Sequence, residues 1–290
     1  MHFKRVKLFL IFIFMLLPLV TACYGSWNFL YEGNNVDKRA DVCKCLNNDS
    51  EFIASHIPSL GSKYTVLIIT DTHFGNTKRE VNCDKLFNYL RSIKGSSDYP
   101  SFVISLGDST DHGQTGQFEK YNDFCQTLIS KYGLNIVLNA CGNHDIYQNN
   151  WANWEENCYP HTSFYTFHTK KFSWYCLDTA SGTVGESQYS QLNELFDNDS
   201  CPKIIYTHYP FTRFNYDCSN MAETTERNKL LSDFARNKVL CVLGGHNHTQ
   251  TFDDLGYKDY GIPSFAYDEM WGLLHVDEDE ETVELEFIGG

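Results

Sequence analysis

The amino-acid sequence predicts an α/β fold, a four-layer αββα sandwich of two mixed β-sheets flanked by helices. Two observations predict it. From Lys63 onward, short runs rich in β-branched residues, typical of buried strands, alternate with segments whose apolar residues recur at helical spacing. After His248 the pattern changes to strands alone. Residues 61–290 contain no internal repeat and no low-complexity linker, so we expect them to form one domain.

The predicted elements follow in order along the chain. Five strands each end at a short polar cluster; they cover residues 65–69, 102–106, 135–139, 203–206 and 239–243. Six further segments are also predicted as strands: residues 163–167, 172–177, 249–252, 262–267, 271–276 and 282–287. Four segments have one apolar helical face: residues 82–93, 116–132, 186–196 and 222–234.

The N-terminus has the pattern of a secretory signal peptide. Lys4, Arg5 and Lys7 precede an apolar stretch at residues 8–20, and small residues follow. This stretch is too short and wrongly flanked for a membrane-spanning helix. We therefore expect residues 1–22 to be removed and the protein to be exported.

Cys23 stands where a bacterial lipoprotein carries its lipid, because residues 19–23 resemble a lipobox. The interpretation we favour is a lipoprotein anchored to the cell envelope through a lipid on Cys23. The alternative is ordinary cleavage after Ala22, which would give a freely secreted protein. Residues 24–60 are polar and mixed, and we expect them to form a tether and a short N-terminal extension.

The mature chain is strongly acidic. Without residues 1–22 it keeps 20 basic and 37 acidic residues, a net charge of −17. Such a surface disfavours nucleic acid and anionic lipid as extended partners, because it would repel both. It does not exclude a small phosphorylated substrate, because bound divalent ions would dominate the local field.

Eleven cysteines are many for this length. Ten remain besides Cys23, an even number that an exported protein could pair. Cys141, Cys176 and Cys241 lie in or beside apolar runs, where a reduced thiol behaves as a small hydrophobic group. Residues 43–45 could be half of a zinc site, but no second matching pair exists, which favours ordinary surface cysteines.

Metal-ligand side chains fill the polar clusters that follow five of the predicted strands. In order, the clusters are Asp71-Thr72-His73, Gly107-Asp108, Gly142-Asn143-His144-Asp145, His208 and Gly245-His246-Asn247-His248. In an α/β sheet, ligands bind in the crevice beyond the carboxyl ends of the strands. The chain therefore brings two aspartates, one asparagine and four or five histidines to one edge. That is the composition of a two-metal hydrolytic site.

The chemistry of these side chains suits two divalent ions. Carboxylate and amide oxygens suit hard cations, and zinc, iron and manganese also accept neutral imidazole. Asp108 follows a glycine that allows close approach, and its two carboxylate oxygens can bridge a pair of ions. Two ions about 3.5–4 Å apart can deprotonate one water, and the resulting metal-bound hydroxide attacks a phosphoryl group. Neutral His144 could protonate the leaving oxygen, and Asp145 could hold its ring in the required tautomer.

These motifs resemble those of the calcineurin-like metallophosphoesterase superfamily, whose signature is D-x-H, G-D, G-N-H-D/E, H and G-H-x-H. The resemblance covers about residues 64–290 and implies two ion sites that share Asp108. The first site would also take Asp71, His73 and His248. The second would also take Asn143, His208 and His246. The resemblance further implies that His144 is the catalytic histidine. The donor chemistry suits two Mn, Fe or Zn ions and leaves open which of them is bound.

Differences from the signatures of three branches of this superfamily argue against membership of those branches. Serine/threonine protein phosphatases carry phosphate-binding arginines where this chain has His112 and Cys141. Purple acid phosphatases carry a tyrosine where this chain has Asp111, and lipid A pathway hydrolases lack the histidine present here as His144. What remains resembles the bacterial phosphodiesterase-type group.

We therefore expect an exported, two-metal phosphoesterase that hydrolyses a small phosphodiester or phosphomonoester. One alternative is a nuclease, against which the acidic composition and the missing basic stripe argue. Another is a non-catalytic surface-binding lipoprotein on the same scaffold, which would not need the proton donor His144. Lys78, Arg79 and Arg213 could contact a substrate phosphate, but solvated surface charge is the favoured interpretation.

Overall fold

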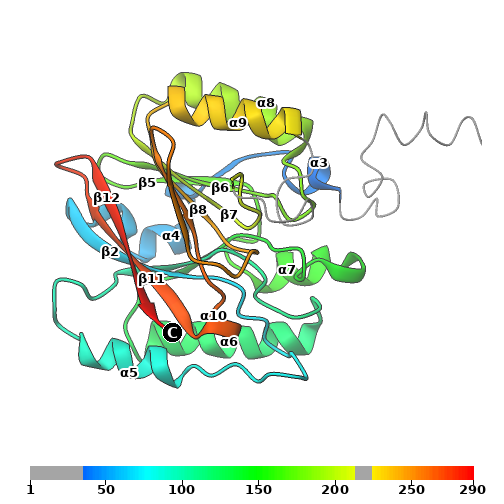
Figure 1. Ribbon diagram of the computed structural model, residues 1–290, viewed down its shortest axis with the longest axis vertical. Coiled ribbons are helices and arrows are strands. Elements are labelled where there is room, and N and C mark those ends of the chain that lie inside the picture. The colour runs from blue at the N-terminus through cyan, green and yellow to red at the C-terminus, as the bar shows by residue number, and fades with distance from the viewer. Residues whose placement is uncertain (1–34, 213–223) are drawn as a thin grey trace, which may run out of the picture.

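The computed structural model of the protein describes residues 35–212 and 224–290. Two mixed β-sheets pack face to face, and helices cover their outer surfaces (Figure 1). The predicted four-layer αββα sandwich is therefore confirmed. The predicted signal peptide, Cys23 and Arg213 lie outside the described residues.

The five-stranded sheet has the order β12-β11-β2-β3-β4. Its strands are β2 (Lys63–Ile69), β3 (Phe102–Ser105), β4 (Val137–Asn139), β11 (Met270–Asp277) and β12 (Thr282–Gly289). β2, β3 and β4 are parallel, so their carboxyl ends meet at one edge, whereas β11 runs antiparallel to both of its neighbours. The outer face is covered by α5 (Asp84–Ser92) and α6 (Thr115–Ser130) (Figure 1).

The seven-stranded sheet has the order β1-β5-β6-β7-β8-β10-β9. Its strands are β1 (Lys44–Cys45), β5 (Tyr165–His168), β6 (Ser173–Leu177), β7 (Lys203–Thr207), β8 (Val239–Gly244), β9 (Thr251–Asp254) and β10 (Lys258–Gly261). β6, β7, β8 and β10 are parallel. The outer face is covered by α8 (Gly185–Asn198) and α9 (Thr224–Arg236) (Figure 1).

The central strands are buried on both faces, which explains their continuous apolar runs. In β2, Val66 and Ile68 belong to the core between the two sheets. Leu67 and Ile69 pack instead with Leu86 of α5. Successive side chains of a strand point to opposite faces, so a single apolar run contributes to two cores.

One predicted strand, at residues 262–267, is wrong. The strand lies earlier in the chain, as β10, and is followed by the short helix α10 (Phe265–Asp268). Pro263 interrupts the run because it has no N–H to donate to a sheet. Ser264 then caps the amino end of α10 with its side chain. The other predicted strands and helices are present, with ends that shift by a few residues.

Residues 35–60, for which we expected a tether and a short extension, pack against the domain. They form α3 (Val36–Arg39), β1, η2 (Leu46–Asn48), α4 (Ser50–Ala54) and η3 (Ile57–Ser59). Phe52 and Ile57 are fully buried in the core between the sheets. Arg39 forms a buried ion pair with Asp178, with 2.9 Å between Nε and Oδ2. This stretch is therefore part of the folded domain.

Nine cysteines lie in the described residues; all are free, and five are buried. Cys141, Cys176 and Cys241 are among the buried ones, as their apolar surroundings in the sequence predict. Burial raises the pKa of the Cys125 thiol to about 12, so this group is a neutral part of the core at physiological pH.

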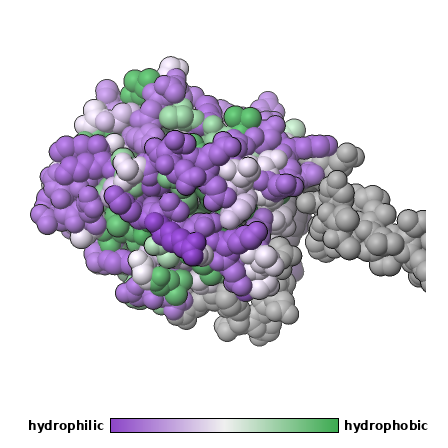
Figure 2. All heavy atoms as spheres, turned by 90° about the horizontal axis from the view of Figure 1, so that it is seen from above, coloured by the Kyte–Doolittle hydropathy of each residue, from purple (hydrophilic) through white to green (hydrophobic). Residues whose placement is uncertain are grey.

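Over residues 35–212 and 224–290, no helix is long and apolar enough to cross a membrane. The face seen from the side of α8 and α9 is mostly hydrophilic, with hydrophobic residues in small separate groups (Figure 2). This distribution agrees with the acidic composition of the chain, whose formal net charge is −14.

Candidate metal centre

The loops that follow β2, β3 and β4 meet the loops that follow β7 and β8. Side-chain donor atoms there form two groups of three, within 4.8 Å of one another in each. We call Asp71, His73 and His248 the first group, and Asp108, His208 and His246 the second group. Each group combines residues from both sheets. A further set of His73, Asp108 and His144 connects the two groups.

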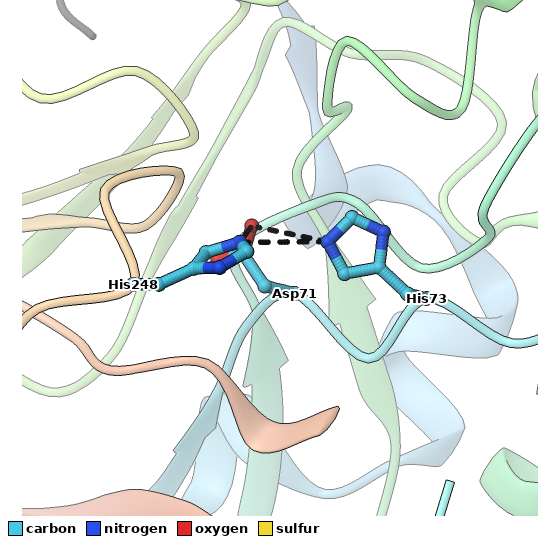
Figure 3. Close-up of side chains that lie close together, drawn as sticks. All are labelled: Asp71, His73 and His248. Carbon is cyan, nitrogen blue, oxygen red and sulfur yellow. Dashed lines mark hydrogen bonds and ion pairs between the residues drawn. The ribbon is translucent and has the colours of Figure 1, made fainter. Parts of the chain in front are cut away.

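The first group is arranged around the Asp71 carboxylate (Figure 3). His248 Nε2 lies 3.0 Å from Asp71 Oδ1, and His73 Nε2 lies 3.8 Å from the same oxygen. The two histidine nitrogens lie 3.5 Å apart. Asp71 Oδ2 accepts hydrogen bonds from the Thr70 hydroxyl at 2.6 Å and the His246 N–H at 3.0 Å. These bonds fix the carboxylate so that Oδ1 faces the two imidazoles.

The second group is arranged around His208 Nε2. His208 Nδ1 lies 2.9 Å from the Leu106 carbonyl oxygen, which can only accept, so Nδ1 carries a proton. Nε2 lies 3.1 Å from Asn143 Oδ1 and 3.2 Å from His246 Nδ1. It also lies 3.3 Å from Asp108 Oδ2. Asn143 therefore joins the second group, and the structure brings together all seven residues predicted as metal ligands.

Five of these seven residues have a left-handed backbone conformation. Their φ angles are 52° at Asp71, 44° at His73, 51° at Asp108, 66° at His246 and 50° at His248. Residues other than glycine rarely adopt positive φ, and each such conformation costs about 1–3 kcal/mol. Strain of this kind collects at functional sites, where the surrounding structure maintains it. The backbone geometry thus marks the same residues as the side-chain chemistry.

Two glycines allow the loops after β3 and β4 to touch. A Cβ on Gly142 would lie 2.1 Å from the backbone nitrogen of Asp108 and 2.2 Å from its Oδ1. Gly107 has a φ of +98°, and a Cβ there would lie 2.7 Å from the Gly142 nitrogen. Only glycine fits such an approach. The glycines in the G-D and G-N-H-D motifs are therefore required by packing.

Burial and mutual charge set the pKa values in the centre. Burial favours a higher pKa for Asp71, but a hydrogen bond from His248 and the charge of His208 lower it to about 2. The pKa of Asp108 is also lowered against the effect of burial, mainly by His208. Burial favours a lower pKa for His208, but Asp108 raises it to about 9. Both carboxylates are thus ionised at neutral pH, and the centre favours positive charge.

His144 lies beside the two groups, with its ring centroid 4.8 Å from that of His73. Its Nδ1 lies 2.8 Å from the Asp111 carbonyl oxygen. Because this oxygen can only accept, Nδ1 carries a proton and Nε2 points away from the loop. The Tyr147 hydroxyl lies 3.3 Å from Nε2. The backbone of the loop after β3 therefore fixes the ring.

The expected contact between Asp145 and His144 is wrong. Asp145 Oδ1 accepts hydrogen bonds from the Thr110 N–H at 3.0 Å and the Thr110 hydroxyl at 3.2 Å, and Oδ2 accepts from the Gly142 N–H at 3.0 Å. Neighbouring side chains in a turn point in different directions, and that of Asp145 points into the loops. Burial and the charge of Asp108 raise its pKa to about 7. Asp145 thus connects the loops after β3 and β4.

A family model described as calcineurin-like phosphoesterase matches residues 64–273. The chain belongs to this family. Its motifs, fold and converging donor atoms agree with this membership. No curated protein matches the chain.

Solved structures share the fold of this calcineurin-like phosphoesterase at low sequence identity. A dimetal phosphatase from Danio rerio is 14% identical with a TM-score of 0.62, over 78% of this chain and 96% of its own. A 5'-nucleotidase from Candida albicans is 15% identical with a TM-score of 0.51, over 78% of this chain and 51% of its own. The protein PhoD is 10% identical with a TM-score of 0.51, over 77% and 68%. At these identities the similarity concerns the fold alone.

The donor set of this calcineurin-like phosphoesterase fits divalent metal ions. It offers two buried carboxylates, one amide oxygen and four imidazoles, a combination that suits manganese, iron or zinc. Burial lowers the pKa of His73, which therefore stays neutral and able to ligate. Asp108 belongs both to the second group and to the set with His73, so it can reach an ion at either position.

Three tyrosines contact the histidines of the centre, and no sequence pattern indicated them. The pairs are Tyr209 with His246 (3.8 Å between ring centroids), Tyr267 with His248 (5.1 Å) and Tyr147 with His144 (4.4 Å). The place of Tyr209 directly after His208 is a signal that could have revealed one of them. Tyr267 could not be placed, because residues 262–267 were expected to form a strand.

Proposed function

We propose that the protein is an exported phosphoesterase that uses two divalent metal ions to hydrolyse a small phosphomonoester or phosphodiester. The observation that carries the proposal is the position of Asp108. Its carboxylate belongs to the second group and also to the set with His73 and His144. One residue thus connects both donor groups with the candidate proton donor. Membership of the calcineurin-like phosphoesterase family supports the class of reaction.

The two donor groups would hold the ions. The first group with Asp108 would hold one, and the second group with Asn143 would hold the other. When bound, the ions would supply an activated water and positive charge to neutralise the phosphoryl group. The chain would supply fixed ligands, because backbone and hydroxyl groups already hold the Asp71 carboxylate and the His208 ring.

His144 would protonate the leaving oxygen. The Asp111 carbonyl keeps a proton on Nδ1, and a neutral ring then has none on Nε2. The donor is therefore the imidazolium form, not the neutral ring expected from the sequence. Nε2 faces the Tyr147 hydroxyl, and a leaving oxygen would bind on that side. Positioned acid catalysis of this kind contributes about 10²–10⁴ in rate.

The composition supports a small substrate rather than a long nucleic acid. The formal net charge of −14 would repel an extended polyanion, whereas a single phosphoester can be neutralised locally. An intact ligand set together with His144 also favours an enzyme over a non-catalytic binding protein on this scaffold.

A reconstituted enzyme tests the proposal directly. Protein stripped of metal and reloaded with Mn²⁺ or Zn²⁺ should bind two ions per chain and hydrolyse members of a panel of phosphomonoesters and phosphodiesters. Elemental analysis gives the stoichiometry, and release of phosphate or alcohol gives the activity. Cleavage of oligonucleotides alone would favour the nuclease alternative. Two bound ions without activity on any ester would favour the binding-protein alternative.

Export and anchoring are a separate part of the proposal. The basic residues before the apolar stretch and the lipobox-like residues 19–23 support a lipid on Cys23. Each buried CH₂ of an acyl chain contributes about 0.8 kcal/mol, so two or more chains hold a protein on a membrane without a spanning helix. We expect Cys23→Ser to release the protein into the soluble fraction. Mass spectrometry that finds an unmodified Cys23 at the mature N-terminus would instead indicate free secretion.

A further inference from the structure

Two tyrosines at the metal centre are exposed although aromatic rings favour burial. Tyr147 lies in the short turn η4 (Tyr147–Asn149) and is 39% exposed; Tyr267 lies in α10 and is 38% exposed. In the described residues, six large hydrophobic side chains are exposed, and these two lie beside the donor groups. Exposed apolar surface next to a polar site is typical of ligand binding.

The two tyrosines stand at the ends of a row of rings. Tyr147 lies 4.4 Å from His144 between centroids, and His144 lies 4.8 Å from His73. His73 in turn lies 5.6 Å from Tyr267. His144 therefore lies between Tyr147 and His73, and Tyr267 lies on the far side of His73. We call Tyr147 and Tyr267 the tyrosine pair.

Tyr209 offers a comparison within the same centre. Its ring stacks on His246 with 3.8 Å between centroids and an angle of 26°, and it is only partly exposed. Tyr267 lies at a similar angle of 25° to His248 but at 5.1 Å, and it is more open to solvent. Support of a histidine ring does not require that exposure. The exposed ring surface of the tyrosine pair therefore remains able to contact a bound ligand.

The surroundings of Tyr267 also include a cation. The Arg79 guanidinium lies over its ring, 5.7 Å from the centroid. The Tyr267 hydroxyl accepts a hydrogen bond from Asn76 Nδ2 at 3.1 Å, which fixes the ring beside the first group. One side of the centre thus combines ligands for metal ions, a cation and exposed aromatic surface.

We propose that the tyrosine pair binds a flat aromatic group carried by the phosphoester substrate and thereby sets its specificity. The inference rests on the proposed function, because it places the phosphoryl end at the donor groups. Stacking on an aromatic side chain is tolerant of ring type, so both an aryl ester and a nucleoside phosphate offer the required chemistry. They differ in the distance between ring and phosphorus.

Binding of two phosphonates, which are not hydrolysed, tests the inference. We expect protein loaded with Mn²⁺ to bind phenylphosphonate about tenfold more tightly than methylphosphonate, measured by calorimetry. Tyr147→Leu and Tyr267→Leu should each reduce this ratio several-fold. Tyr147→Phe and Tyr267→Phe, which keep the rings, should preserve it. Tyr189→Leu is the matched control, since Tyr189 lies on α8 against Asp233, away from the centre, and it should leave the ratio unchanged.

The outcomes separate this inference from the proposed function. Equal affinity of the unaltered protein for the two phosphonates, or binding of neither, would overturn the inference. So would an equal loss for both phosphonates in the leucine variants, because it would mean that the tyrosines only orient the histidines. Absence of turnover on every ester would defeat the proposed function, while the phosphonate ratio would still decide the role of the tyrosine pair. Turnover of phenyl phosphate against adenosine 5'-monophosphate then identifies the preferred distance between ring and phosphorus.

Discussion

The two sheets contribute different chemistry to one centre. The loops after β2, β3 and β4 of the five-stranded sheet supply every candidate oxygen ligand: Asp71, Asp108 and Asn143. The loops after β7 and β8 of the seven-stranded sheet supply three of the four histidines: His208, His246 and His248. The negative charge that attracts metal ions thus comes from one sheet, and most of the groups that exchange protons come from the other.

Burial differs between the two carboxylates and one of these histidines, His248, whereas His208 is as buried as the carboxylates. Asp71 and Asp108 are almost completely buried and are held by hydrogen bonds. His248 keeps 33% of its side chain exposed, and its Nε2 hydrogen-bonds to Asp71 itself. Buried charge is costly unless it is compensated. The five-stranded sheet therefore presents an anionic site that is incomplete until the histidines of the other sheet, and metal ions, neutralise it.

The largest effect is expected from removing the charge that both groups share. Asp108→Asn keeps the shape of the side chain but replaces one of its two carboxylate oxygens with an NH₂ group, which cannot ligate a metal ion. We expect hydrolysis to fall below detection and the metal content to fall below two ions per chain. The control is Asp123→Asn on the exposed side of α6, which should retain both. Full metal content with Asn at position 108 would show that the two groups do not depend on a shared carboxylate.

His144→Ala separates ligand binding from proton transfer. His144 lies in the loop after β4, and its ring hydrogen-bonds to the Asp111 carbonyl oxygen, whereas only its backbone N–H donates to the Asp108 carboxylate. We expect turnover to fall by about 10²–10⁴ while both ions stay bound. Elemental analysis and steady-state kinetics on the same preparation measure the two quantities. Loss of an ion in this variant would place His144 among the ligands.

That the ligands meet at one edge was accessible from the sequence, but their division between the two sheets was not. Short β-branched runs such as residues 65–69 and 239–243 are correct as β2 and β8 to within two residues. The carboxyl ends of parallel strands meet at one edge, so polar residues after each run must lie close together. The glycines in the motifs also indicated that the loops approach each other closely. The structure shows this approach between Gly142 and Asp108.

What the sequence did not predict depends on contacts between distant residues. Arg39 and Asp178 are 139 positions apart, and their ion pair helps to hold a segment whose composition resembles a tether. Asp145 was assigned to its neighbour His144, although its hydrogen bonds reach back to Thr110. Tyr267 was placed in a strand because an apolar run does not reveal whether it forms a short helix. Local patterns carry no information on such partners.

The histidines of the seven-stranded sheet should make metal binding sensitive to pH. Without metal, Asp108 raises the pKa of His208 to about 9, so the ring is protonated at neutral pH. An ion must displace this proton, because only the free nitrogen ligates. We expect the affinity for Mn²⁺ to rise as the pH rises toward about 9, by up to about tenfold per pH unit for this one proton.

Calorimetry in two buffers of different ionisation enthalpy measures the protons released on metal binding. His161→Asn should release the same number as the unaltered protein, since His161 lies beside Glu155 and away from the centre. A binding enthalpy that does not depend on the buffer would mean that His208 is already neutral. In that case, metal binding would release no proton from the histidines of the seven-stranded sheet.

The smallest effect concerns the N-terminal segment, which extends only the seven-stranded sheet through the pairing of β1 with β5. Asp49 caps α4 and forms an ion pair with Lys44 at 2.9 Å. Burial favours a higher pKa for Asp49, but hydrogen bonds from Lys44, Phe52 N–H and Tyr159 lower it to about 2. A lowered pKa stabilises the fold above the ordinary value of 3.8, and this contribution is lost as the pH falls toward about 2.

Two substitutions at this position separate the charge from the cap. Asn is also a good capping residue, so Asp49→Asn removes only the charge and should cost at most about 1 kcal/mol at neutral pH. Asp49→Ala also removes the cap and should cost about 0.5–2 kcal/mol more. Urea unfolding at several pH values measures both. The difference between Asp49 and Asn should shrink as the pH falls toward about 2 and vanish below that value, where the carboxyl is neutral. A difference that persists in strong acid would mean that it does not come from the charge of Asp49.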